Sequence, residues 1–286
     1  MKALADTELT IIGTGLMGTS LAMALRGKVA ALHGVDANAE SRELAAPSFD
    51  TMAPQANFAS SDVIALATPV QTILRLLDHV RLNAHPGTLI FDLGSAKRPI
   101  VAAMDRLPDT LLAVGGHPMC GKETSGPSSA DGTIYRGCMF ALCPTERSTP
   151  ETLVFMEALV GACASRPIVM SAEQHDRAVA SISHLPYLLS AGLVATVSRS
   201  PDDAPWMLAS SGFRDTSRLA ASDVTMMGDT VLSNRDAVLD AIHLFTAQLA
   251  EIELALRSGD EIHLKNLLDD ARQMRLWWAN RQEKEL

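Results

Sequence analysis

The chain has 286 residues, of which 47% are hydrophobic and 4% are aromatic, a composition that is ordinary for a soluble α/β protein of one or two domains. Its formal net charge is −9, and this acidic balance without a basic cluster argues against nucleic acid and anionic membranes as partners. An anionic substrate would therefore need arginine or lysine side chains placed at its own binding site.

A glycine-rich turn follows the first predicted strand. Residues 9–12 form a short apolar run, residues 13–18 have the pattern Gly-x-Gly-x-x-Gly, and residues 19–25 are helical in composition. This is the dinucleotide-binding fingerprint in its required context of a strand before and a helix after. The first glycine permits the tight turn, the second admits a pyrophosphate, and the third lets the helix pack closely on the strand. The positive end of the helix then faces the phosphates.

A second predicted strand, residues 29–35, ends in Asp36. An acidic residue at this distance from the fingerprint accepts hydrogen bonds from the ribose hydroxyls and repels a 2′-phosphate, which favours NAD over NADP. A purely structural glycine turn is the alternative, but such a turn would not need Asp36. With two residues that close the next strand, the candidate cofactor-binding residues are Gly13, Gly15, Leu16, Met17, Gly18, Asp36, Thr68 and Pro69.

Strands and helices continue to alternate through the first half of the chain. The predicted strands cover residues 63–67, 88–92, 111–114, 139–142 and 168–170, with helices over 70–80 and 99–107. This alternation predicts a doubly wound, mostly parallel sheet, so we expect a Rossmann-type α/β domain over residues 1–170.

One histidine stands in a glycine-rich segment after the strand at 111–114. Residues 115–126 are too rich in Gly, Ser and Pro for a helix, and they are expected to place His117 in a loop at the carboxyl end of that strand. Open α/β sheets bind their ligands at such ends. Ser95 leaves another strand end on the same side, where it could bind a substrate hydroxyl or the nicotinamide ribose, or cap the next helix. Lys97 could simply be solvated.

The cysteines show no metal-binding or disulfide pattern. Cys120 lies close to His117 in sequence, so a nucleophilic Cys/His pair is an alternative, although nothing nearby would orient it. The first eight residues lack the apolar core of a secretion signal, and no apolar run is expected to approach the roughly 20 residues that cross a bilayer. We expect a reduced, cytoplasmic protein without a metal site, and its cysteines are Cys120, Cys138, Cys143 and Cys163.

After residue 170 the pattern becomes helical. A polar run at 210–218 carries Arg214 and Arg218. Predicted helices cover residues 172–183, 185–199, 238–256 and 264–277, and residues 258–260 separate the last two. Because apolar residues of the 238–256 helix recur by steps of four and three, this stripe could form a dimer interface. We expect a helical domain over 171–286, with no further domain appended.

Seven short segments share their residues and their order with one known family. They cover residues 15–18, 67–70, 92–97, 117–126, 175–176, 183–186 and 212–218. Three of them are specific in combination: the run His-Pro-Met-x-Gly-x-Glu-x-Ser-Gly that begins at His117, the run Ser-His-Leu-Pro, and the run Gly-Phe-Arg-Asp. In these segments the chain resembles the prephenate/arogenate dehydrogenases of tyrosine biosynthesis, from about Leu9 to beyond Asn234.

The resemblance implies a Rossmann domain joined to a helical dimerisation domain in a homodimer. The implied activity is NAD-dependent oxidative decarboxylation of prephenate to 4-hydroxyphenylpyruvate, with arogenate (giving tyrosine directly) or dual specificity as the alternative. It implies that His117 accepts the proton of the ring hydroxyl while Ser95 helps to position it. It further implies that an arginine, Arg218 in preference to Arg214, holds the ring carboxylate and that His184 lies near the substrate. Imidazole and guanidinium suit these tasks.

Several alternatives remain open in the sequence. A β-hydroxyacid dehydrogenase would carry a catalytic lysine in its second half, yet residues 171–256 contain none. A catalytically silent NAD-sensing regulator would keep the fingerprint and Asp36 but would not need His117, Ser95 and Arg218 together. His184 could be satisfied by backbone groups, and the adjacent pair at 175–176 is more readily explained as structural than as a catalytic dyad.

Overall fold

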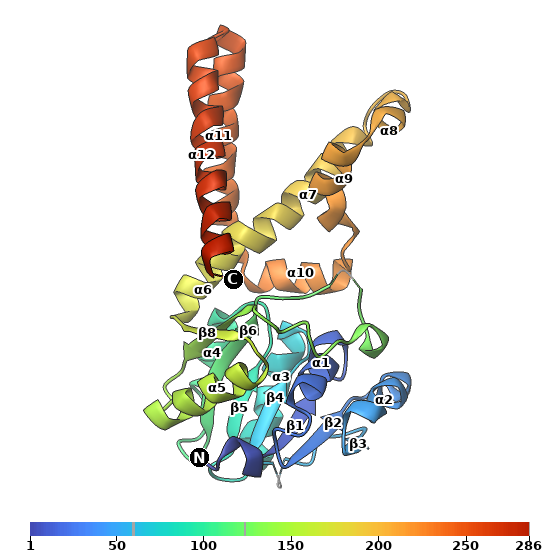
Figure 1. Ribbon diagram of the computed structural model, residues 1–286, viewed down its shortest axis with the longest axis vertical. Helices are drawn as coiled ribbons and strands as arrows, with labels where there is room; N and C mark the ends of the chain where they lie inside the picture. The colour runs from blue at the N-terminus through green and yellow to red at the C-terminus, as the bar shows by residue number, and fades with distance from the viewer. Residues whose placement is uncertain (59–60, 123, 286) are drawn as a thin grey trace. The chain divides into compact units, whose positions relative to one another are not determined.

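The computed structural model describes residues 1–58, 61–122 and 124–285. Within them, eight strands form one sheet in the order β3-β2-β1-β4-β5-β6-β7-β8, and each neighbouring pair is parallel except β6 with β7. This confirms the predicted mostly parallel, doubly wound α/β fold (Figure 1). The strands are β1 Glu8–Ile12, β2 Ala31–Val35, β3 Thr51–Ala53, β4 Val63–Leu66, β5 Leu89–Asp92, β6 Leu112–Pro118, β7 Met139–Pro144 and β8 Arg166–Val169.

Helices cover both faces of the sheet, because alternate side chains of each buried strand point to opposite sides. In β4, Val63 and Ala65 pack into one apolar cluster, which includes side chains of α1 and α5. Ile64 and Leu66 pack into a second cluster, which includes side chains of α3 and α4. The helices of this part are α1 Leu16–Leu25, α2 Ala39–Ala45, α3 Val70–Asn83, α4 Arg98–Met104 and α5 Pro150–Ala162.

The strand before His117 is longer than the sequence indicated. β6 pairs with β5 only as far as Val114, and it then continues against the antiparallel strand β7, where His117 lies opposite Ala141. The expected loop position of His117 is therefore wrong, since the residue belongs to the strand. Gly116 makes this path possible, because a Cβ atom there would lie 2.4 Å from the backbone oxygen of Asp92.

A long helix follows the sheet without a break between the helices predicted over residues 172–183 and 185–199. α6 (Ala172–Val179) continues through a π-helical turn, Ala180–His184, into α7 (Leu185–Val197). The π-helical turn ends two residues before Pro186. Because Pro186 has no N–H to donate, the regular hydrogen-bond pattern of the helix is interrupted here. By length and composition this continuous helix could cross a membrane, although no single apolar run in it is that long. It also carries buried His175, Asp176 and His184.

Shorter helices complete the first of two compact units, Met1–Arg235. They are α8 Ala204–Leu208, α9 Ser211–Ser217, the 3₁₀ turn Arg218–Ala221 and α10 Val224–Ser233. The second unit, Asp236–Leu286, contains most of α11 (Arg235–Ser258) and α12 (Glu261–Glu285). These are longer forms of the two predicted C-terminal helices, and the break between them contains Gly259 at φ +67°.

The tight contact at Gly116 generates a stability prediction. The Gly116→Ala variant should lower the free energy of unfolding by about 1–3 kcal/mol, because its methyl group meets backbone that cannot move aside. The control is Gly161→Ala, at an exposed helical position of α5 with open space around it. Replacing this helical glycine with alanine should raise the free energy of unfolding by about 0.5–1 kcal/mol. Urea unfolding of both variants measures the difference, and equal stabilities would refute the argument.

Candidate active site

The glycine loop between β1 and α1 has room for a phosphate at one position only. Gly13 has φ +97°, and a Cβ atom there would lie 2.5 Å from the backbone oxygen of Ala67. A Cβ atom on Gly18 would lie 1.9 Å from the oxygen of Gly13, so both glycines are required by the packing of the chain itself. Gly15 faces open space and caps the N-terminus of α1, which begins at Leu16. This free position at a helix N-terminus fits a pyrophosphate.

Asp36 lies beside that loop at the end of β2. Its Oδ2 accepts hydrogen bonds from the backbone N–H (2.9 Å) and hydroxyl (3.2 Å) of Thr14, and its Oδ1 accepts one from the N–H of Asn38 (2.9 Å). A carboxylate has about four acceptor positions, so Asp36 can hold the loop and still accept from a ribose hydroxyl. The structure thus gives Asp36 a second task, the support of Thr14, that the sequence did not indicate.

Three further predicted cofactor residues border the same loop. Met17 forms part of α1, and its carbonyl accepts a hydrogen bond from the hydroxyl of buried Tyr135 at 2.8 Å. Pro69 is exposed and precedes α3. The hydroxyl of Thr68 is buried and has no hydrogen-bond partner among the described residues. Because buried polar groups are nearly always satisfied, this unpartnered hydroxyl beside Gly13 fits a bound group at the loop.

A buried ion pair holds the strand that carries His117. Lys97 and Asp92 are both fully buried and form a short ion pair, so the expectation of a solvated Lys97 is wrong. The pair binds both backbone polar groups of Gly116: Asp92 Oδ1 accepts from its N–H (3.0 Å), and Lys97 Nζ donates to its carbonyl (2.6 Å). Two side chains therefore replace the backbone ladder just where β6 no longer pairs with β5.

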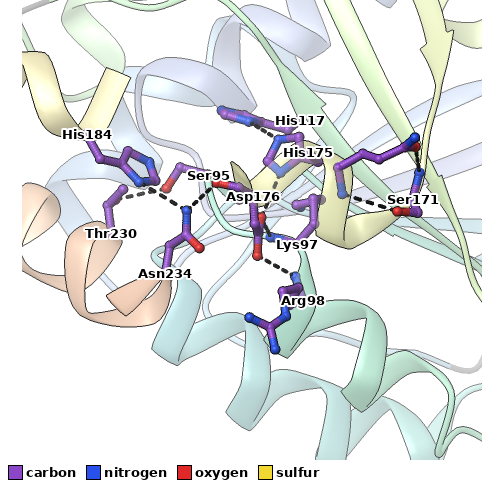
Figure 2. A network of polar contacts seen from close by, with 12 residues as sticks. Ser95, Lys97, Arg98, His117, Ser171, His175, Asp176, His184, Thr230 and Asn234 are labelled. Atoms are coloured by element: carbon purple, nitrogen blue, oxygen red, sulfur yellow. Dashed lines mark hydrogen bonds and ion pairs between the residues drawn. The ribbon is translucent and has the colours of Figure 1, made fainter. Parts of the chain in front are cut away.

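His117 is the first member of a hydrogen-bonded chain of three side chains (Figure 2). Its Nδ1 lies 2.8 Å from Nε2 of His175, and Nδ1 of His175 lies 2.8 Å from Oδ1 of Asp176. The Asp176 carboxylate also accepts from the backbone N–H groups of Lys97 (2.7 Å) and Arg98 (2.9 Å) at the start of α4. The carboxylate therefore joins α6 to the N-terminus of α4 and, through His175, to His117.

Ser95 and His184 both contact the segment that contains α10. The Ser95 hydroxyl lies 2.8 Å from the hydroxyl of Thr230, and it does not cap α4. Nδ1 of His184 lies 3.3 Å from the amide nitrogen of Asn234, which also donates to the backbone oxygen of Asp176 at 2.8 Å. Figure 2 shows His184, Ser95 and the pair of His117 and His175 along one edge of the network.

The two arginines lie on the α9 segment and the turn that follows it. Arg214 is exposed and pairs with Asp215 at 3.2 Å, and Arg218 is also exposed, at the start of the 3₁₀ turn. The hydroxyl of Ser190 in α7 donates to the oxygen of Thr216 (3.1 Å) and accepts from the N–H of Ala220 (3.0 Å). Arg218 therefore lies at the level of Ser190, which is about 9 Å along the helix from His184.

Burial keeps the two histidines neutral. Burial, together with the neighbouring His175, Lys97 and His184, holds the pKa of His117 well below its ordinary value of 6.5. Burial also lowers the pKa of His184 to about 4, against the opposing effect of Asp176. Both rings are therefore proton acceptors near pH 7.

The thiol of Cys120, three residues after His117 in the sequence, is not an activated nucleophile. Burial, with the nearby Cys138, raises the pKa of Cys120 to about 12. A thiol must lose its proton to act as a nucleophile, so this value argues against the alternative of a catalytic Cys/His pair.

Sequence reasoning missed three residues of the network. His175 had been assigned a structural role with Asp176, yet it contacts His117 directly. The sequence did contain a signal for this residue, because residues 175–176 form one of the segments that the chain shares with the family it resembles. Lys97 stands five residues after its partner Asp92, a spacing that could have suggested a pair. Asn234 gave no signal, and Glu123 of the His-Pro-Met run lies outside the described residues.

Comparisons with known proteins identify the family of this chain. Residues 21–169 match the model of the prephenate dehydrogenase nucleotide-binding domain, and residues 171–270 match that of its dimerization domain. Prephenate dehydrogenase of Bacillus subtilis (strain 168) is 30% identical over 291 residues, covering 96% of this chain and 76% of that protein.

Two crystal structures agree with this assignment. Prephenate dehydrogenase of Aquifex aeolicus, in complex with hydroxyphenyl propionate and NAD+, has 27% identity and a TM-score of 0.89, covering 96% of this chain and 99% of that chain. Synechocystis arogenate dehydrogenase also has 27% identity, with a TM-score of 0.84 over 95% and 99%. Together with the glycine loop, these matches support an NAD-type cofactor. The chain belongs to the prephenate dehydrogenase family.

Proposed function

We propose that this enzyme oxidises and decarboxylates prephenate to 4-hydroxyphenylpyruvate, with NAD as its preferred cofactor. The observation that carries the proposal is the hydrogen-bonded His117, a neutral and partly buried imidazole at the carboxyl edge of the sheet that also presents the glycine loop. Arogenate is the second candidate substrate, and the likeness to an arogenate dehydrogenase from Synechocystis favours keeping it.

The cofactor would be held by the loop between β1 and α1. Gly15 and the N-terminus of α1, including Leu16 and Met17, would bind the pyrophosphate. Asp36 would accept from the adenosine ribose, and its charge would repel a 2′-phosphate, which supports NAD over NADP. The Thr68 hydroxyl and Pro69 would line the same loop. When bound, the nicotinamide supplies the acceptor for the hydride that leaves the substrate.

His117 would act as the base. As hydride leaves the ring carbon, positive charge develops there, and removal of the hydroxyl proton relieves it. A neutral imidazole can accept that proton, and such positioned bases contribute about 10²–10⁴-fold to a rate. The Ser95 hydroxyl would position the substrate hydroxyl. Loss of the ring carboxylate as carbon dioxide leaves an aromatic ring, so this step is downhill.

The ring carboxylate of the substrate needs a cation as its partner. Lys97 is already neutralised by Asp92, and His184 is uncharged near pH 7. We therefore assign the ring carboxylate to an arginine of the α9 segment. The backbone on both sides of Arg218 is bonded to Ser190 of α7, the helix that follows His184, which supports Arg218. His184 would lie near the substrate as a neutral hydrogen-bonding group.

The helical part would join two copies of the chain. We propose a Rossmann domain over residues 1–170 and a helical substrate and dimerisation domain over residues 171–286, in a cytoplasmic homodimer. Large apolar side chains lie exposed on the C-terminal helices, as an interface between helices requires. Examples are Leu244, Leu254, Leu256, Ile262 and Trp277. The acidic charge gives no reason to expect a nucleic-acid or membrane partner.

A four-way assay tests the function. Purified enzyme is mixed with prephenate or arogenate and with NAD or NADP, and the absorbance of reduced nicotinamide is followed. We expect kcat/KM to be highest for prephenate with NAD, because Asp36 disfavours the 2′-phosphate. Higher kcat/KM with arogenate would make arogenate the substrate, and higher kcat/KM with NADP would overturn the role of Asp36. No reduction with either substrate would favour the catalytically silent regulator.

Replacement of the proposed base should affect catalysis and not cofactor binding. His117→Asn should lower kcat by about 10²–10⁴-fold, with little change in the Kd for NAD. The control is His79→Asn, an exposed position on α3. Because burial lowers the pKa of His117, the acidic limb of the wild-type kcat/KM profile should lie below pH 6.5. Near-normal turnover of the His117 variant would remove it from the mechanism.

The two arginines can be separated by kinetics. Arg218→Ala should raise the KM for prephenate by about 10- to 100-fold, as expected for one lost charge-assisted hydrogen bond. Arg214→Ala is the matched control and should change this KM by no more than about twofold. Arg218→Lys should recover part of the loss, since it restores the charge without the planar fork. A reversed pattern would assign the carboxylate to Arg214.

A further inference from the structure

We propose that His175 and Asp176 fix the tautomer of His117, placing its single proton on Nδ1 and leaving Nε2 as the free proton acceptor. This proposal deepens the proposed function and rests on His117 as its base. Free histidine side chains favour the opposite tautomer, with the proton on Nε2, in which the outward nitrogen could not act as a base. A defined partner at Nδ1 is therefore needed for a base that acts through Nε2.

The hydrogen bonds determine the position of each proton. An ionised carboxylate only accepts hydrogen bonds, so Nδ1 of His175, 2.8 Å from Asp176 Oδ1, must carry a proton. In a neutral ring the other nitrogen is then an acceptor. Nε2 of His175 lies 2.8 Å from Nδ1 of His117, so His117 must donate there. Its only proton is used in that bond, and Nε2 keeps its lone pair.

The Asp176 carboxylate stays ionised in its buried position. Burial acts to raise the pKa of Asp176, but hydrogen bonds from His175 and from the N–H groups of Lys97 and Arg98 outweigh it, so the pKa is lowered. The two N–H groups form the start of α4, where the helix dipole favours a negative charge.

The proposal takes the form of His175 that donates to Asp176 and accepts from His117, and the alternative form is a cationic ring. A cationic His175 would donate from both nitrogens. His117 would then have to accept at Nδ1 and carry its proton on Nε2, which would leave no base. The two protonation patterns thus predict opposite tautomers of the same ring.

The same chain of bonds serves the step after proton transfer. When Nε2 of His117 takes the hydroxyl proton, the ring becomes a cation whose Nδ1–H points at His175. That proton can move to Nε2 of His175, so the positive charge shifts next to Asp176. No atom is gained or lost beyond this one proton. His175 is in this sense a positioning residue, because His117 stands between it and the substrate.

Nitrogen NMR of the complete protein tests the tautomer directly. In protein labelled with ¹⁵N-histidine, long-range correlations separate protonated from unprotonated ring nitrogens, and the His117→Asn variant identifies the signals of His117. We expect a protonated Nδ1 and an unprotonated Nε2 in the wild type. His175→Gln, whose amide can accept from His117 and donate to Asp176, should keep this pattern. His175→Leu should shift His117 toward the Nε2–H form, and the exposed His79→Gln serves as control.

Kinetics supply the second readout. His175→Leu should lower kcat by about 10²-fold with KM little changed, and His175→Gln should stay within about tenfold of the wild type. A protonated Nε2 in the wild type would overturn the proposal whatever the activities, and this spectrum needs no variant at position 175 to fold. The expected tautomer combined with near-normal turnover of His117→Asn would instead leave the tautomer assignment in place and defeat the role of His117 as base.

Discussion

The buried ion pair between Lys97 and Asp92 is the interaction on which the site depends. Removing one partner of such a pair leaves an uncompensated charge in the interior, at a cost of about 3–5 kcal/mol. Here the pair also satisfies both polar groups of Gly116, where β6 has left its neighbour β5. His117 is the next residue, so the pair sets the path of the backbone that carries the proposed base.

Asp176 extends this arrangement from the sheet to the helical part of the first unit. Its carboxylate binds the N-terminus of α4, while its backbone oxygen accepts from Asn234, after α10. The same carboxylate holds His175, which contacts His117. The hydrogen bonds of Asp176 therefore both hold the helices together and orient the imidazole of His117 through His175. A substitution in this network should disturb both packing and proton transfer.

Local patterns in the sequence were enough to predict the nucleotide-binding half. Gly13 and Gly18 are required by contacts within a few residues or with the neighbouring strand, and such requirements appear in a fingerprint. The contact between His117 and His175 spans 58 residues and depends on how α6 packs against α4 and β7, which no local pattern records. The burial of Lys97 was missed for a related reason. A lysine between a strand and a helix is usually solvated, and only the departure of β6 from β5 creates a backbone that its ammonium can bind.

The distribution of charge explains why the arginines must lie outside the buried network. The chain carries a net charge of −9, so it does not attract an anionic substrate as a whole. The buried lysine is neutralised, and His117 must be uncharged if it is to accept a proton. A guanidinium placed directly against His117 would lower the affinity of that ring for a proton still further. Positions on α9 and its following turn, supported by Ser190, would separate the cation proposed to bind the carboxylate from the imidazole proposed to take the proton. Such a separation would let one site hold an anion and still contain a neutral base.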